Sequence, residues 1–116
     1  MSETGESTRI ERVRDSYRAY ETGDRNLIES VLGPNLTFYA PPDPGIDRET
    51  YFERCWPNGG AIERFEFVRL EEIAGDAVLV TYEATKEDGK RFRNTEIHAF
   101  DGEQVCRVEV YFGWDL

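Results

Sequence analysis

The sequence predicts a single α+β domain in which N-terminal helices pack on one face of an antiparallel sheet. Two observations lead to this prediction. Apolar residues recur with helical spacing in the first half of the chain, and four long β-rich runs fill the second half, joined by short turns that contain Gly. The 116 residues fit one hydrophobic core, since domains cluster near roughly 100 to 150 residues.

Three helices are expected in the first half. Thr8 and Glu11 have the spacing of a capping box at the start of the first helix. Asp24 and Asp47 are the expected N-caps of the second and third helices. The apolar stripes are Ile10, Val13, Tyr17 and Tyr20, then Leu27, Ile28, Val31 and Leu32, then Tyr51, Phe52, Cys55 and Trp56. The expected helix ends are Thr22-Gly23, Gly33-Pro34, and Pro57 with Gly59-Gly60.

One short strand and four long strands are expected. LTFYA, residues 36–40, is β-prone and leads into PPDPG, residues 41–45, which is expected to be a stiff loop. The long runs cover residues 62–73, 77–86, 91–100 and 104–114. The last two joints contain Asp-Gly pairs, which are strong hairpin signals, so these runs predict an antiparallel meander.

Charge argues against nucleic acid and against an anionic membrane surface as partners. The net charge is −10, which repels phosphates. Four arginines at positions 9, 12, 14 and 18 alternate with acidic residues, as is typical of a solvated helix face.

Cysteine content and the N-terminal segment favour a cytoplasmic protein. Cys55 and Cys106 lack the dense spacing of a disulfide framework and are expected to be reduced core thiols. Residues 1–8 do not have the pattern of a signal peptide, and no run of about 18 apolar residues follows.

The segment NTEIHAF, residues 94–100, contains the only histidine. As a strand it places Asn94, Glu96 and His98 on one face. The hairpin register decides which residues of the last strand join them, and a one-residue slip reverses the answer. Pairing like with like predicts a polar face and an apolar face. The polar face is Asn94, Glu96, His98, Arg107, Glu109 and Tyr111; the apolar face is Ile97, Ala99, Val108, Val110 and Phe112.

The chain resembles a known superfamily over nearly its whole length, and a single domain of this type is expected to cover residues 1–116. The residues that carry the resemblance are Tyr17, Tyr20, Gly23 and Asp24, the PPDPG loop and the ending NTEIHAFDGEQVCRVEVYFGW. Together with the order of elements, they resemble the nuclear-transport-factor-2-like (NTF2-like) superfamily, and within it the SnoaL-like, ketosteroid-isomerase-like branch. The resemblance implies a cystatin-like cone, in which a curved sheet wraps around the helices and encloses a pocket.

The resemblance also implies roles for both faces. The polar face would line a pocket for a small apolar or aromatic ligand, with Glu96, His98 and Glu109 as catalytic candidates. The ligand-contact candidates are Tyr17, Tyr39, Trp56, Tyr82, Asn94 and Tyr111. The outer face, with Ile97, Val108, Val110 and Phe112, would form a homodimer interface.

A carboxylate in an aromatic pocket loses hydration, so its pKa is expected to rise and make it a base near neutral pH. Glu96 or Glu109, assisted by His98, would then take a proton from a carbon next to a carbonyl. Tyr111, Tyr17 or Tyr39 would donate to the enolate oxygen. The reaction would be an isomerisation, cyclisation or dehydration.

Three alternatives stay open at this stage. The first is a satisfied structural network in a non-catalytic ligand-binding or interaction module. The second is an epoxide-hydrolase-like site built from Asn94, Arg107, Glu109 and a tyrosine. The third is a divalent metal held by one imidazole and two carboxylates, but such sites usually use more than one His. No metal or cofactor is therefore expected.

Overall fold

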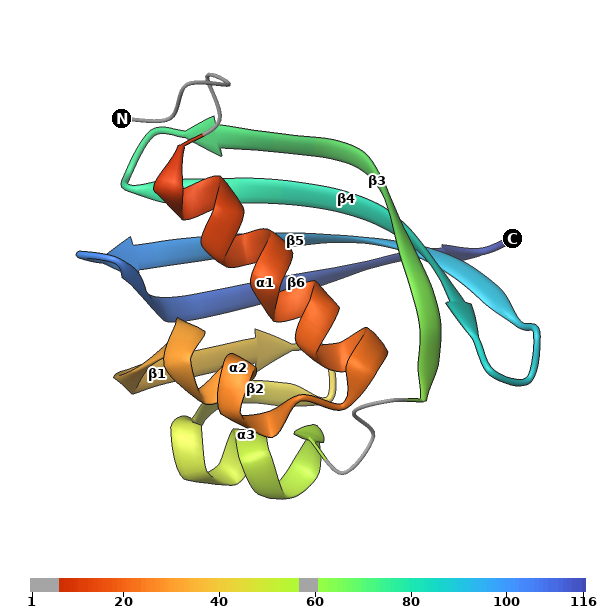
Figure 1. The fold of residues 1–116 in the computed structure, drawn as a ribbon, viewed down its shortest axis with the longest axis horizontal. Coiled ribbons are helices and arrows are strands. Elements are labelled where there is room, and N and C mark those ends of the chain that lie inside the picture. The colour runs from red at the N-terminus through yellow and green to blue at the C-terminus, as the bar shows by residue number, and fades with distance from the viewer. Residues whose placement is uncertain (1–6, 57–60) are drawn as a thin grey trace.

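The computed structural model describes residues 7–56 and 61–116, and in this part of the chain three α-helices lie on one face of a six-stranded sheet (Figure 1). The helices are α1 (Thr8–Thr22), α2 (Arg25–Val31) and α3 (Arg48–Arg54). The strands are β1 (Leu32–Ala40), β2 (Asp43–Asp47), β3 (Ile62–Ile73), β4 (Ala77–Lys86), β5 (Arg91–Asp101) and β6 (Gln104–Asp115). The α+β prediction is confirmed.

The predicted helix signals act almost where the sequence places them. Asp24 and Asp47 cap α2 and α3 as expected, accepting from the amides of Leu27 and Thr50. The cap of α1 is Ser7 rather than Thr8, because the Ser7 hydroxyl accepts the hydrogen of the Ile10 amide. The predicted end of the third helix at Pro57 and Gly59-Gly60 lies outside the described residues.

The first two strands differ from the prediction. Residues 32–34 begin β1 instead of ending the second helix, and residues 43–45 of the expected loop belong to β2. β2 lies at the edge of the sheet, where it pairs only with β1. An edge strand tolerates Pro44, since an edge amide needs no ladder partner.

The four long strands form the predicted antiparallel meander. The sheet order is β2-β1-β6-β5-β4-β3, and β1 runs parallel to β6 while every other neighbouring pair is antiparallel. Gly75 and Asp76 in one turn, and Gly102 in another, have positive φ, which explains the turn residues at these joints. The sheet curves around α1 (Figure 1), and the register shifts in β3 at Glu63 and Val68 accompany its bend.

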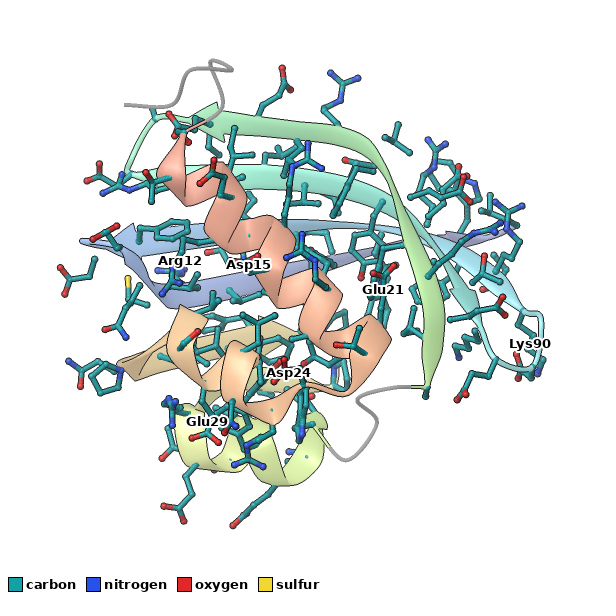
Figure 2. The ribbon with its side chains drawn as sticks, viewed as in Figure 1. Arg12, Asp15, Glu21, Asp24, Glu29 and Lys90 are labelled. Atoms are coloured by element: carbon teal, nitrogen blue, oxygen red, sulfur yellow. The ribbon has the colours of Figure 1, made fainter. Side chains whose placement is uncertain are left out.

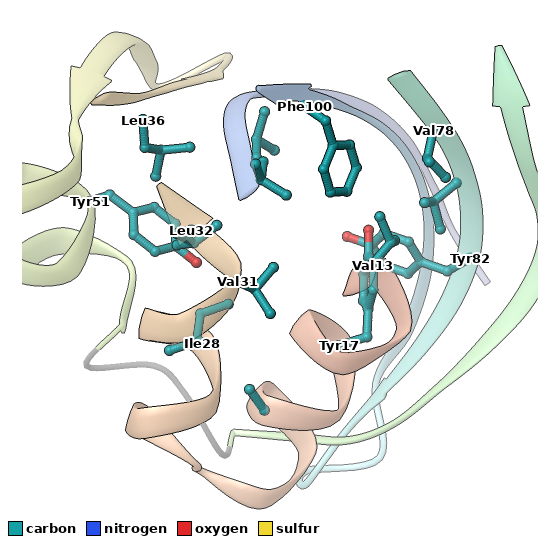
Figure 3. Packing of buried hydrophobic residues seen from close by; sticks show 14 of the residues in the cluster. Val13, Tyr17, Ile28, Val31, Leu32, Leu36, Tyr51, Val78, Tyr82 and Phe100 are labelled. Carbon is teal, nitrogen blue, oxygen red and sulfur yellow. The ribbon is translucent and has the colours of Figure 1, made fainter. Parts of the chain in front are cut away.

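The hydrophobic core fills the space between the helices and the concave face of the sheet. Val13 and Tyr17 of α1 meet Val78 and Tyr82 of β4 there, as Figure 3 shows. The rest of the core comes from α2, β1 and α3: Ile28 and Val31, Leu32 and Leu36, and Tyr51. Charged side chains such as Asp15, Asp24 and Glu29 lie on the helical side of the molecule, and Lys90 lies in a turn (Figure 2).

A β-bulge at Cys106 overturns the predicted register of the last hairpin. Asp101 pairs with Gln104 and Phe100 with Val105, but Ala99 then pairs with Arg107, so Cys106 has no partner. Without the bulge, Glu96 would face Glu109 and His98 would face Arg107, as predicted from the sequence. In the structure Glu96 pairs with Val110 and His98 with Val108. The extra residue moves the side chains of β6 from Arg107 to Phe112 to the other face, and a second unpaired residue, Gly113, restores the original alternation at Trp114.

The two faces of the hairpin are therefore composed differently from the prediction. Val108, Val110 and Phe112 share the inner face with Glu96 and His98. The outer face carries Thr95, Ile97, Ala99, Arg107, Glu109 and Tyr111. The predicted interface set of Ile97, Val108, Val110 and Phe112 is wrong as a single surface, because Ile97 lies opposite to the other three.

Candidate functional site

A cavity of about 170 Å³ lies between the helices and the concave face of the sheet. Its polar groups come from α1, β4 and β5, and its walls are aromatic and aliphatic. The lining residues are Ser16, Tyr17, Tyr20, Ile28, Leu32, Leu36, Phe38, Tyr51, Ile62, Phe65, Tyr82, Phe92, Glu96, His98 and Val108. Apolar walls with a few converging polar groups are typical of a small-molecule site.

Glu96 is the centre of the polar network in this cavity. The Tyr17 hydroxyl donates to Oε1 of Glu96 at 2.7 Å, and the Tyr82 hydroxyl donates to Oε2 at 2.9 Å. His98 Nε2 lies 3.0 Å from Oε1. The side chain of Glu96 is only 15% exposed, so these three partners replace most of its water.

The pKa of Glu96 lies below its ordinary value, contrary to the expectation of a raised pKa. Burial by itself raises the pKa of this carboxyl. Hydrogen bonding and charge interaction with His98, together with the hydroxyl bonds from Tyr17 and Tyr82, lower it by more. Glu96 is therefore ionised at neutral pH, and the same network makes it a weaker base than an unbonded buried carboxylate.

The two tyrosines that bind Glu96 hold their protons firmly. Burial, followed by the charge of Glu96, raises the pKa of Tyr17 and of Tyr82 well above the ordinary value. Their rings pack edge to face with centroids 5.2 Å apart, and Phe65 lies 4.9 Å from Tyr17. Both hydroxyls thus remain donors, and the packed rings fix where they point.

His98 joins the network through one ring nitrogen only. The residue is 4% exposed, and its Nε2 lies near both Glu96 and the Tyr17 hydroxyl, 3.3 Å away. Because a carboxylate only accepts, the bond to Glu96 requires a hydrogen on Nε2. Nδ1 is buried and has no hydrogen-bond partner among the described residues.

Chemically, the cavity presents an ionised acceptor held by three donors. Tyr17, Tyr82 and His98 all direct a hydrogen at Glu96. The predicted role of Tyr17 as a donor to an enolate oxygen is therefore not available while Glu96 is ionised, since its hydrogen is already bonded.

Three predicted site residues lie outside the cavity. Glu109, Tyr111 and Tyr39 are on the outer face of the sheet, where Tyr111 donates to Glu109 at 2.9 Å and is 53% exposed. Arg107 pairs with Glu109 at 2.6 Å and stacks over the Tyr39 ring at 4.9 Å. The predicted pair of adjacent carboxylates does not form, because the bulge separates Glu96 and Glu109 onto opposite faces.

Two further predicted contacts lie at the edge of the site. Asn94 donates to the Tyr82 hydroxyl at 3.4 Å and accepts from the Gly113 amide at 3.2 Å, so it supports Tyr82. Trp56 packs on Tyr20, which does line the cavity, with ring centroids 5.1 Å apart. Neither Asn94 nor Trp56 is among the residues that line the cavity.

Several wall residues were not predicted, notably Phe65 and Phe92. Phe65 lies on the edge strand β3. Its backbone amide donates to the side chain of Glu21 in α1 at 2.7 Å, which holds this strand against the helix. Phe92 shares the inner face with Asn94 and Glu96. The alternation of apolar residues in these two strands was the available signal, but it identifies an inner face and not the boundary of a cavity.

A larger surface hollow of about 710 Å³ lies beside α2 and α3. Two of its charged groups form an ion pair, and two of its arginines stack on an aromatic ring. Arg25 pairs with Glu29 at 2.8 Å, and Arg25 and Arg48 stack on Phe52 at 4.1 and 4.9 Å. Among the described residues, no group of three or more His, Cys, Asp or Glu side chains is placed to hold a metal ion.

Comparison with solved structures identifies the fold. An NTF2-like protein of unknown function from Cytophaga hutchinsonii is 21% identical, with 97% of this chain and 95% of that chain covered and a TM-score of 0.69. A proposed ketosteroid isomerase from Kribbella flavida is 14% identical, with 91% and 78% covered and a TM-score of 0.75. A proposed polyketide cyclase from Sinorhizobium meliloti is 16% identical, with 86% and 93% covered and a TM-score of 0.70.

The chain therefore has the NTF2-like fold, also described as a cystatin fold in a similar protein from Novosphingobium aromaticivorans. This confirms the resemblance seen in the sequence at the level of the fold. No protein-family profile matches the chain, and no curated protein matches it. At identities below 25%, structural similarity supports the fold but not an activity, so function must be argued from the site.

Proposed function

We propose that this protein binds a small molecule in the cavity beneath α1, with Glu96 as the polar anchor. The observation that carries the proposal is the placement of one ionised carboxylate among aromatic and aliphatic walls. Glu96 is held in one orientation by Tyr17, Tyr82 and His98, which come from three different elements. Preorganised polar groups of this kind fix the orientation of a ligand.

Binding is tested with one-ring probes such as toluene and benzyl alcohol, detected by ligand-observed NMR. Two matched variants, one on each face of the β5–β6 hairpin, test whether the probe binds in the cavity. Val108→Phe fills the cavity and is expected to abolish binding, whereas Ile97→Phe places the same new side chain on the outer face and is expected to leave binding unchanged. Equal binding by both variants would contradict the proposal.

Proton abstraction is a second candidate function for the same site, and the ionised state of Glu96 favours it. In this step a C–H bond next to a carbonyl breaks, the proton moves to Glu96, and the electron pair forms an enolate. Once protonated, Glu96 no longer needs three donors, so the Tyr17 or Tyr82 hydroxyl is released to bond the enolate oxygen. His98 donates to Glu96 through its Nε2 hydrogen, so in this step it orients the carboxylate.

This second candidate predicts hydrogen–deuterium exchange at the α-carbons of a one-ring ketone such as cyclohexanone in D₂O. We expect exchange above the buffer rate with the wild type and none with Glu96→Gln. Glu109→Gln, which removes a carboxylate from the outer face, is the matched control and is expected to retain the rate. A wild type that does not exceed the buffer rate would exclude enolisation and leave ligand binding intact.

We also propose that the outer face of the sheet forms a homodimer interface, with a residue set different from the one predicted from the sequence. Ile97 lies on this face with Tyr111 and with Trp114, which is 62% exposed. Arg93 stacks on Trp114 at 5.3 Å. Tyr, Trp and Arg are enriched in protein interfaces, and the helices cover only the other face.

A cytoplasmic location is proposed from the two cysteines. Cys55 and Cys106 are both free thiols, as expected from the sequence, and free thiols suit a reducing compartment. Within residues 7–56 and 61–116, every helix falls short of the length and apolarity that a membrane crossing demands.

A further inference from the structure

The cavity contains one acidic group and no basic side chain to balance it. Glu96 is the only carboxylate among the described residues that line the cavity, and none of these lining residues is Lys or Arg. The remaining lining groups are apolar, hydroxyl or imidazole. The negative charge of the cavity wall therefore comes from Glu96.

His98 supplies one of the three donors to Glu96. The bond to Glu96 uses the hydrogen on Nε2. Nδ1 is buried and has no hydrogen-bond partner among the described residues. His98 therefore acts on Glu96 through Nε2 alone, and the carboxylate is the acceptor that a ligand would meet.

The unused hydrogen-bonding capacity of Glu96 also favours a ligand that donates. A carboxylate offers about four acceptor sites, and three donors already approach Glu96, two at Oε1 and one at Oε2. The capacity that remains is for a further donor at Oε2. A ligand anion would meet the negative charge of Glu96, whose three donors are already bonded to it, whereas a ligand N–H would occupy the remaining acceptor position.

The walls supply a second attraction for a cation. Tyr17, Phe65, Tyr82 and Phe92 form a continuous group of rings, with successive centroids 4.9, 5.2 and 6.3 Å apart. Aromatic faces carry negative charge density, and clustered rings are a known way to recognise organic ammonium groups. The rings and the carboxylate thus both favour a positively charged ligand.

The volume limits the size of the ligand. An apolar cavity of about 150 Å³ holds one benzene molecule, and drug-sized ligands occupy roughly 300 Å³ or more. At about 170 Å³, this cavity has room for one ring with a short substituent.

We propose that the cavity selects a small organic ammonium ion of about one ring, whose N–H group donates to Glu96 while its carbon skeleton lies against the aromatic walls. This inference rests on the proposed ligand-binding function and names the chemical class of the ligand. It predicts an order of affinity among molecules of nearly equal shape: ammonium first, neutral alcohol and hydrocarbon next, carboxylate last.

The test compares four probes of one shape, benzylammonium, benzyl alcohol, toluene and benzoate, at neutral pH and physiological salt. Benzylammonium is expected to bind about tenfold tighter than toluene or benzyl alcohol, since hydrogen bonds to charged groups are the stronger ones. Benzoate is expected not to bind. Glu96→Gln is expected to remove the tenfold preference for benzylammonium over toluene.

The acidic surface of the protein requires a control, because a net charge of −10 attracts any cation. Val108→Phe fills the cavity without changing the charge, so it is expected to abolish benzylammonium binding. Binding that persists in Val108→Phe would place the cation on the surface and overturn the inference. If Glu96→Gln does not fold, the order of the affinities of the four probes for the wild type still tests the inference.

The outcomes separate this inference from the function on which it rests. If toluene binds and benzylammonium binds no tighter, the cavity is a ligand site and the ammonium class is wrong. If none of the four probes binds, both the inference and the proposed ligand binding are overturned. If benzylammonium leads and loses its advantage in Glu96→Gln, both are supported.

Discussion

Replacing Tyr82 by Phe tests whether the network around Glu96 stabilises the protein. The substitution removes one hydroxyl and leaves the ring, so its contacts with Tyr17, Phe65 and Phe92 remain. The hydroxyl is the only hydrogen-bond donor to Oε2 of Glu96 among the described residues, at 2.9 Å. Hydrogen bonds to charged groups contribute about 1.5–3 kcal/mol, and Glu96 is 15% exposed, so a loss of about 2 kcal/mol is expected.

The assay is urea unfolding followed by tryptophan fluorescence and circular dichroism. Tyr51→Phe is the matched control, because Tyr51 is equally buried at 4% exposure and its hydroxyl is not among the groups that bind Glu96. In a double-mutant cycle with Glu96→Gln, the effect of Tyr82→Phe is expected to shrink by about 1 kcal/mol or more. If Tyr82→Phe costs no more than Tyr51→Phe, or if the two changes add, the network does not stabilise the fold.

Three further predictions concern pH, the register and the dimer. Because the pKa of Glu96 is below its ordinary value of 4.5, its contribution to stability is present above that pH and lost as the pH falls below it; Glu96→Gln should therefore lose less stability than the wild type between pH 6 and 3, measured by urea unfolding. Deleting Cys106 removes only the bulge residue and should leave a folded protein with the same interstrand NOEs, whereas deleting Glu109 turns Val110 outward and should unfold it. Ile97→Asp should give a folded monomer in sedimentation, whereas Val108→Asp should destabilise the fold by about 3 kcal/mol or more.

Much of the fold could be predicted because its signals are local. The side chains of Asp24 and Asp47 cap helices by binding amides three residues later, so a short segment contains the whole interaction. The turns at residues 74–76 and 101–102 work in the same way, through positive φ at Gly75, Asp76 and Gly102. The bounds of β3 and β4 followed from such turns and from apolar alternation.

The edge strand β2 was missed for a physical reason. Prolines at positions 41, 42 and 44 are typical of a loop, and only the position of the segment in the sheet makes a strand possible there. At the edge, a residue without an amide hydrogen breaks no central ladder.

The candidate site was predicted in part. Glu96, His98, Tyr17 and Tyr82 come together as expected from a polar inner face, but Glu109, Tyr111 and Tyr39 do not join them. Pairing like with like failed because a buried carboxylate does not need polar neighbours along its own hairpin. It needs a few donors, and here two come from α1 and β4 across the cavity and the third, His98, from β5 itself.

The sequence by itself determined the three helices, the four long strands, their order and the face on which Asn94, Glu96 and His98 lie, because caps, turns and period-two alternation act over a few residues. Only the tertiary structure decided what shares that face. One unpaired residue, Cys106, sets the direction of the side chains of β6 from Arg107 to Phe112. Whether a bulge forms depends on packing: Val105 and Val108, three positions apart, are both buried, which strict alternation along the strand does not allow.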